Sequence, residues 1–190
     1  MPGWHLFVYR LPSKPSSARV AVWRDLRRLG ALPLQQAVVA LPAGRGFDER
    51  LDAVEARVAA EGGSSYRFVV DGDARLEADW NALRHQEYEE IVEECETKFD
   101  REIEFEIFRG NLTAGEAEEI EADLEKLRAW FARVDARDVF GAPARERAAA
   151  AIERCARQLE DFERRVFEAE SEDGPSLAPP AKLPWGETGG

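Results

Sequence analysis

The stretch WHLFVYRLPSKPSSARVAVWRDLRRLG, residues 4–30, sets the pattern of the N-terminal part of the chain. Its first eight residues form an apolar and aromatic run that ends at a proline, which predicts a buried strand over residues 4–11. The loop that follows is rich in turn-forming residues and supplies Ser16 or Ser17 as the N-cap of a helix. We expect that helix to reach about Leu29, with Gly30 as its C-cap.

Strand and helix patterns then alternate up to residue 73. Residues 32–41 read as a strand in which Pro33 marks an edge or bend, residues 47–61 as a helix, and residues 66–70 as a further strand. This order predicts a small α+β sandwich over residues 1–73, with two helices on one face of a sheet. If residues 32–41 form two short strands, the order becomes β-α-β-β-α-β, the ferredoxin-like arrangement. Periodicity alone leaves both possibilities open.

Long charged helices are predicted for residues 74–170. The first begins near Ala74, but its end is ambiguous because residues 103–107 alternate as a strand would. Thr113 and Glu116 form a capping-box pattern that starts the second. Apolar residues then recur with 3-4 spacing on both sides of a Gly- and Pro-containing connection: Ala117, Ile120, Leu124, Leu127, Phe131 and Val134, followed by Ala148, Ile152, Cys155, Leu159, Phe162 and Val166. Two matching seams predict an antiparallel hairpin, with the first helix as a third member.

The end of the chain has a different composition. Residues 171–190 are rich in Gly, Pro, Ser and Ala, and we expect them to form a disordered tail.

Charge is divided unevenly along the chain. The 190 residues carry a formal net charge of −12, which taken alone argues against nucleic acid as a partner. Residues 1–47 nevertheless hold seven Lys or Arg against one acid, Asp25, so this part carries +6 and the remainder −18. Such asymmetry indicates a basic working surface joined to an acidic segment.

Three arginines share one face of the first predicted helix. Arg24, Arg27 and Arg28 are spaced i, i+3, i+4 on the side opposite its apolar stripe, and Arg10 and Lys14 precede them. Guanidinium groups suit phosphate oxygens because each offers a planar fork of donors that stays protonated. This face is therefore a candidate polyanion site. The alternative is a solvated helix face that pairs with the acidic helices of this chain or of a partner.

Other chemistry-bearing residues indicate packing or solvation. Glutamates are dense over residues 87–96 and His85 lies one turn away, but the Glu-x-x-His order of helical metal sites is absent. We interpret these glutamates as a solvated surface, which could also shield the basic helix. His5 is expected within the sheet, and Cys95 and Cys155 are expected as buried packing residues. Because no nucleophile–base arrangement or phosphate-binding loop is present, we expect no catalytic residues, metal or other cofactor.

The sequence also carries a signal about location. It contains no run of about 18 apolar residues, and its start lacks the basic segment and cleavage site of a signal peptide. The two cysteines follow no metal-ligand or disulfide-framework spacing. We therefore expect a cytoplasmic protein without a membrane span.

Several long strings resemble the N-terminal region of the ChrB chromate-resistance proteins. These strings are residues 4–12, 15–24, 26–31, 34–38, 41–42, 124–130 and 137–142. The similarity runs through roughly residues 4–170. The resemblance implies a bacterial, chromate-responsive transcriptional regulator that binds promoter DNA of a chromate-efflux operon.

The resemblance also implies particular DNA contacts and partners. The basic residues that match those held to contact DNA in the family are Arg10, Lys14, Arg19, Arg24, Arg27 and Arg28. Members continue into a second domain credited with chromate sensing, so we expect this chain to act as a standalone N-terminal module. A second copy of the chain or a separate sensor-domain protein is then a possible partner. The alternative function is a protein-interaction or oligomerisation module that does not bind DNA.

Overall fold

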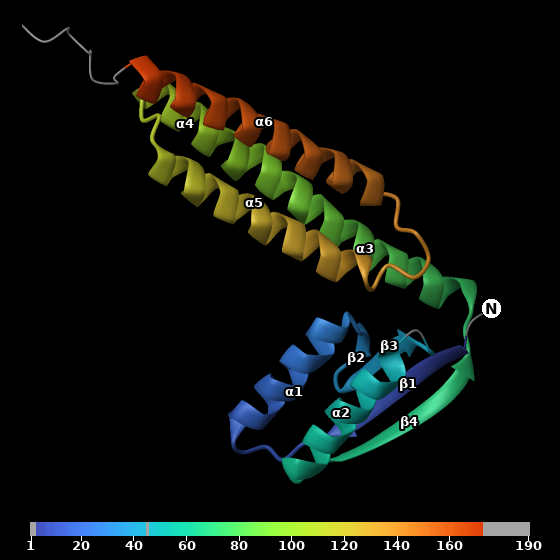
Figure 1. Cartoon of the computed structure of the whole chain (residues 1–190). Helices are drawn as coiled ribbons and strands as arrows, with labels where there is room; N and C mark the ends of the chain where they lie inside the picture. The colour runs from blue at the N-terminus through green and yellow to red at the C-terminus, as the bar shows by residue number, and fades with distance from the viewer. Residues whose placement is uncertain (1–2, 45, 173–190) are drawn as a thin grey trace, which may run out of the picture.

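The computed structural model describes residues 3–44 and 46–172, which form a four-stranded sheet with two helices on one face and a bundle of long helices (Figure 1). The elements of the first part are β1 Gly3–Arg10, α1 Ser16–Leu29, β2 Leu32–Gln35, β3 Val38–Pro42, α2 Phe47–Ala60 and β4 Ser64–Asp71. The strand order is β2-β3-β1-β4, with every neighbouring pair antiparallel. The α+β prediction is confirmed, and residues 32–41 form two strands in the ferredoxin-like order.

The sandwich is held by one hydrophobic cluster beneath α1 and α2. Phe7 of β1, Val22 of α1, and Leu51 and Val58 of α2 are fully buried in it. His5, as predicted, lies within the sheet: it is buried, and its Nε2 pairs with the carboxylate of Asp48 in the first turn of α2. This hydrogen bond lowers the pKa of Asp48. The sheet face toward the helices is therefore closed and ordered.

The two ends of α1 differ in how well the sequence predicts them. The serine N-cap is wrong: the helix already includes Ser16, and the preceding Pro15 is extended with no side-chain cap. Pro15 has a fixed φ and no N–H, so it can end the loop directly before the helix, which leaves the serines inside the first turn. The C-cap is confirmed. Gly30 has φ 72, its N–H bonds to the Arg27 carbonyl, and the next N–H bonds to the Leu26 carbonyl.

The second part is a three-helix bundle. α3 Ala74–Glu94 continues through a π-turn, η1 Cys95–Phe99, into α4 Asp100–Arg109, and the three form one long helix. α5 Ala114–Asp135 and α6 Arg145–Glu172 pack against each other and against α3 (Figure 1). The antiparallel hairpin with a third member is confirmed. Residues 103–107, whose alternation resembled a strand, are helical, and their burial follows the helix rather than the alternation: Ile103 and Glu106 are buried, whereas Glu104 and Phe105 are exposed.

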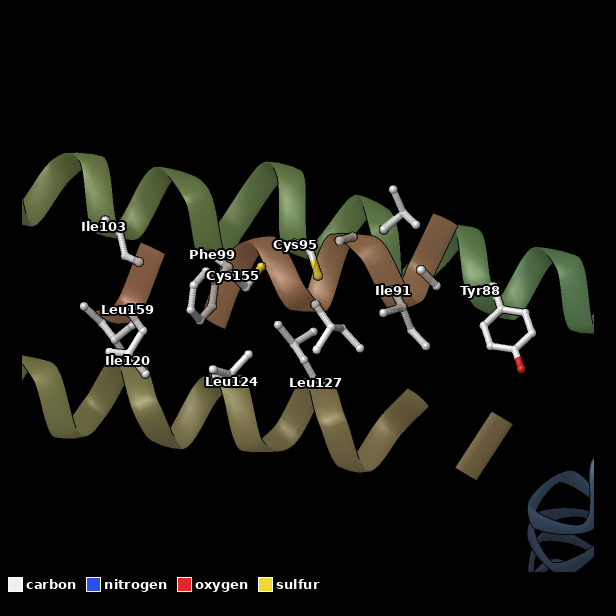
Figure 2. Close-up of a cluster of buried hydrophobic side chains, with 14 of the residues drawn as sticks. Tyr88, Ile91, Cys95, Phe99, Ile103, Ile120, Leu124, Leu127, Cys155 and Leu159 are labelled. Atoms are coloured by element: carbon white, nitrogen blue, oxygen red, sulfur yellow. The ribbon is translucent and has the colours of Figure 1, made fainter. Parts of the chain in front are cut away.

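The π-turn keeps the seam of the long helix pointing into the bundle. Cys95, Phe99 and Ile103 are spaced by four residues and all three are buried. Residues at this spacing drift around an α-helix of about 3.6 residues per turn, and a wider π-turn offsets the drift. In Figure 2 these side chains project toward those of α5 and α6, including Leu124 and Leu159. The expected seams of α5 and α6 line the same cluster.

The loop before α5 carries half of the expected capping box. Thr113 Oγ1 accepts a hydrogen bond from the Glu116 N–H at 3.2 Å. The Glu116 carboxylate accepts from the Asn111 side chain at 2.9 Å.

Sandwich and bundle meet through aromatic side chains. Trp80, in the second turn of α3, belongs to the hydrophobic cluster of the sandwich and meets Trp4 and Phe47 edge-on, with ring centroids 5.8 Å apart in both pairs. Phe140, in the connection between α5 and α6, stacks on Trp4 at the same centroid distance. Side chains from both sides of residue 73 therefore contribute to the hydrophobic cluster of the sandwich.

Two other expectations concern the ends of the molecule and its environment. α6 includes Ser171 and Glu172, the first two residues of the expected tail, and residues 173–190 lie outside the described part. Across residues 3–44 and 46–172, every helix is too short or too polar to span a lipid bilayer.

Candidate nucleic-acid interface

The six basic residues predicted to contact DNA are all exposed, and they follow α1 from end to end. Arg10 ends β1, Lys14 lies in the loop, and Arg19 is in the first turns of the helix. Arg24, Arg27 and Arg28 occupy its last two turns. Because α1 has 14 residues, it is about 20 Å long. The structure thus places these residues as two groups along one helix rather than as a single cluster.

Two of the six side chains already have partners. Arg19 donates to the backbone carbonyls of Pro12 and Ser13, which ties the loop to the helix. Arg28 lies 3.4 Å from the carboxylate of Asp25. Among residues 3–44 and 46–172, no carboxylate lies within ion-pair distance of Arg10, Lys14, Arg24 or Arg27. Four of the six positive charges are therefore available to a polyanion.

The acidic helices do not cover this face with ion pairs. In the described part of the chain, none of the six basic residues pairs with a carboxylate of the bundle. Bundle carboxylates instead pair with bundle arginines, as Glu89 does with Arg147 at 2.8 Å and Asp135 with Arg145 at 2.6 Å. Pairing with the acidic helices of this chain, one form of the alternative interpretation, is thus absent over residues 3–44 and 46–172.

Two arginines on α2, which were not predicted from the sequence, widen the basic face. α1 and α2 lie side by side over the sheet (Figure 1). Arg57 pairs with Asp25 of α1 at 2.6 Å, and Arg50 donates to the Arg28 carbonyl at 3.2 Å. Arg50 directly precedes Leu51 and Arg57 directly precedes Val58, and both of these apolar residues are buried. The seven-residue spacing therefore puts the two arginines on the same side of α2, and this spacing could have identified them from the sequence. We call Arg24, Arg27, Arg28, Arg50 and Arg57 the α1–α2 basic surface.

A buried ionic cluster fixes the C-terminal end of α1 against the bundle. Arg84 of α3 donates to the Gly30 carbonyl at 3.1 Å, and Arg137, just after α5, donates to the Arg27 carbonyl at 3.2 Å. Both arginines share the carboxylate of Glu87, at 2.8 and 3.2 Å. Two cations near the last carbonyls also complement the negative end of the helix dipole. The cluster therefore sets the orientation of the basic helix relative to the bundle.

Burial of the cluster changes the pKa of Arg84 and brings its guanidinium against an aromatic ring. Arg84 is fully buried, and desolvation lowers its pKa to about 10, with Glu87 acting in the opposite direction. Its guanidinium lies 4.7 Å from the ring centroid of Trp80, whose Nε1 donates to the Arg137 carbonyl at 3.1 Å. The same aromatic residue thus joins the two cores and supports the cluster.

The remaining candidates do not assemble into a reactive site. Within the described residues, no group of three or more His, Cys, Asp or Glu side chains could hold a metal ion. Cys95 and Cys155 are buried free thiols, as predicted. A hydrogen bond to Cys95, together with burial, raises the pKa of Cys155, which disfavours the nucleophilic thiolate there.

Fold and surface together define a class of protein: a ferredoxin-like sandwich with an exposed basic helix, joined to an acidic three-helix bundle. The chain belongs to the ChrB N-terminal family, since the family model described as "Protein ChrB, N-terminal" matches residues 19–173. The family is associated with chromate resistance.

A relative and the solved structures extend this comparison. Protein ChrB of Cupriavidus metallidurans is 34% identical over 94 residues, which cover 48% of this chain and 29% of that protein. The similarity therefore spans less than a third of the relative. No solved structure matches the chain.

Proposed function

We propose that this protein is a DNA-binding transcriptional regulator of chromate-resistance genes and that it contacts DNA through α1. The observation that carries the proposal is the row of six exposed basic residues that runs from the end of β1 through the loop and along this helix. Four of them, Arg10, Lys14, Arg24 and Arg27, have no carboxylate partner within the described residues. A helix of this kind can enter the major groove, which is about 12 Å wide. Membership of a family associated with chromate resistance supports promoter DNA of a chromate-efflux operon as the target.

The basic residues at the two ends of α1 have different expected roles in DNA binding. Arg24 and Arg27 protrude from the last turns without a carboxylate partner, so they are the candidates for base edges and nearby phosphates. Arg10 and Lys14, at the other end of the helix, are placed to contact phosphates further along the duplex. Arg19 and Arg28 have local partners, so we expect smaller contributions from them.

A salt-dependent titration tests this function. Fluorescence anisotropy on promoter DNA, at several salt concentrations, compares the wild type with the Arg24→Ala/Arg27→Ala/Arg28→Ala variant. Each lost phosphate contact reduces the slope of log K against log salt by about 0.9, so we expect the slope to fall by up to about 3 and the affinity at low salt to drop.

A matched variant separates specific contacts from overall charge. Arg157, Arg164 and Arg165 are exposed arginines on α6, and replacing all three with Ala changes the net charge by the same amount. This control should bind as the wild type does. Absence of binding at low salt, or equal weakening by both triple variants, would contradict the proposal.

A specific observation supports the alternative, a protein-interaction or oligomerisation module. Phe105 and Phe108 of α4 and Phe167 of α6 are 54%, 88% and 72% exposed. α4 and the C-terminal end of α6, which carry them, lie at the end of the bundle that is far from the sandwich (Figure 1). Exposed aromatic side chains that join into one apolar patch mark contact surfaces, and these three residues are the candidates for such a patch. A stable oligomer by light scattering that dissociates on Phe108→Ser, together with no affinity for DNA, would favour this function.

A further inference from the structure

A cavity lies where the sandwich meets the bundle. Its volume is about 760 Å³, within the range of roughly 300–1,000 Å³ typical of small-molecule sites. One wall is formed by α1 and the turn between β2 and β3, and the other by α3 and α5. Neither the comparisons nor the proposed DNA contacts assign a role to this space.

The cavity is lined by large apolar side chains that the two cores leave uncovered. Trp23 of α1 is 50% exposed and Leu34 of β2 is 44% exposed, and both line it. Trp130 of α5 and Leu83 of α3, each partly buried, line the opposite wall. Indole rings on both walls of a concave surface suit a flat, apolar ligand.

Positive charge lies on the same lining as the aromatic rings. The Arg27 guanidinium sits 5.1 Å from the ring centroid of Trp23 and, within the described residues, has no carboxylate in ion-pair range. Arg84 also lines the cavity, is fully buried, and leaves its Nη2 without a hydrogen-bond partner. Arg84 and Arg137 share the single carboxylate of Glu87 at the C-terminal end of α1, so these three side chains hold one more positive than negative charge, which adds to that of Arg27.

Acidic residues limit where an anionic group of a ligand can sit. Glu87 and Glu90 line the α3 wall. A negative group is therefore expected beside α1, at Arg27, whereas a hydrogen-bond donor of the ligand would face Glu90.

A strained backbone position lies in the same wall. Ala37, in the turn between β2 and β3, has φ 61, the left-handed conformation that residues with a Cβ rarely adopt. Its carbonyl is held by the Tyr9 N–H at 3.0 Å, and both residues line the cavity. Strain held in place by surrounding structure is found preferentially at ligand clamps.

We propose that this cavity binds a planar aromatic molecule with one anionic group, its rings against Trp23 and Trp130 and its charge on Arg27. The site does not rest on DNA binding, because occupancy can be measured without DNA. The two proposals can therefore fail separately.

Two fluorescent probes of similar shape and different charge test the site. 1-Anilinonaphthalene-8-sulfonate is an aromatic anion with an N–H donor, and N-phenyl-1-naphthylamine is its neutral counterpart. We expect each wild-type chain to bind one molecule of the anionic probe, with energy transfer from tryptophan to the probe. Trp23→Ala should weaken binding of both probes about tenfold or more. Arg27→Gln should weaken the anionic probe about tenfold, the scale of one charge-assisted hydrogen bond, and change the neutral probe less than twofold.

A control on the distant apolar surface makes the outcome decisive. Phe108→Ala removes the most exposed aromatic ring of the bundle, so it reports probe bound outside the cavity. Unchanged affinity in Trp23→Ala, or a loss in Phe108→Ala as large as that in Trp23→Ala, overturns the site. Equal weakening of both probes by Arg27→Gln overturns the anionic preference, and this variant keeps the test valid if Trp23→Ala does not fold.

Discussion

Gly30 occupies a tightly enclosed turn at the end of α1. It caps α1 in the left-handed conformation, and a Cβ at this position would lie 2.4 Å from Arg84 Nη1 and 2.7 Å from Arg137 Cδ. Although both are side-chain atoms, neither can move freely, because Arg84 and Arg137 are buried and share Glu87. One missing side chain thus makes room for the cluster that orients the basic helix.

Gly30→Ala should therefore destabilise the protein through two separate effects. The left-handed backbone costs an alanine about 1–2 kcal/mol, and displacing the buried ion cluster adds to this, for a total of about 3 kcal/mol or more. The measurement is the free energy of unfolding from urea titrations.

Gly110→Ala is a close control, since Gly110 also caps a helix, with φ 69, and a Cβ there would meet nothing within 4 Å. This variant should show only the backbone cost. Equal losses in the two variants would mean that the arginines yield without penalty.

At the scale of helices and strands, the sequence predicts the features that depend on local residue patterns, such as the helical bundle, and misses those that depend on packing. The 3-4 seams of α5 and α6 are explicit in the chain, and the bundle follows from them. Pro15 overrides the serine N-cap, because φ before the helix is set by its ring and not by the neighbouring hydroxyls. The π-helical turn at Cys95–Phe99 lies where the long helix packs against α5 and α6, and local sequence patterns did not predict it.

The candidate site likewise has one part that the sequence predicts and one part that it does not. Helical periodicity predicts the exposed face of α1, because its apolar and basic positions repeat along the chain. Arg84 and Arg137 belong to highly charged segments and resemble ordinary surface residues in the sequence. Only the packing of the bundle on the sandwich buries them, which is why neither the ionic cluster nor the adjacent cavity was predicted.

The seam of α6 makes a quantitative prediction at this scale. Phe162 is fully buried in the bundle, whereas Phe167 on the same helix is 72% exposed. Phe162→Ala should lower the free energy of unfolding by about 3–5 kcal/mol, because it removes buried surface and leaves a cavity. Phe167→Ala should change it by less than about 0.5 kcal/mol. Chemical denaturation of both variants checks this contrast. Similar losses of unfolding free energy in the two variants would mean that the buried seam of α6 has been assigned to the wrong residues.

For the whole molecule, the aromatic junction determines whether the two parts can be separated. Trp4 is 1% exposed in the intact chain because Trp80 and Phe140 cover it. A fragment of residues 1–73 loses both neighbours, so we expect it to unfold at a lower urea concentration than the full chain, as followed by far-UV circular dichroism.

A second fragment that ends at residue 86 retains Trp80 and Arg84, and it should recover part of the lost stability. Removing a buried tryptophan side chain costs about 3–5 kcal/mol, which sets the size of the expected difference. Identical midpoints for the 1–73 fragment and the full chain would instead support an independent domain ending at residue 73.

The uneven division of charge between the sandwich and the acidic bundle has a consequence beyond contact chemistry. Residues 1–73 carry +2 and residues 74–190 carry −14, so the molecule has an electric dipole moment besides its net charge of −12. In the field of any polyanion this dipole experiences a torque that turns the sandwich toward the polyanion and the bundle away from it. Approach is thus oriented before the surfaces touch, and the repelled bundle faces outward, where it discourages a second molecule from settling on top of the first.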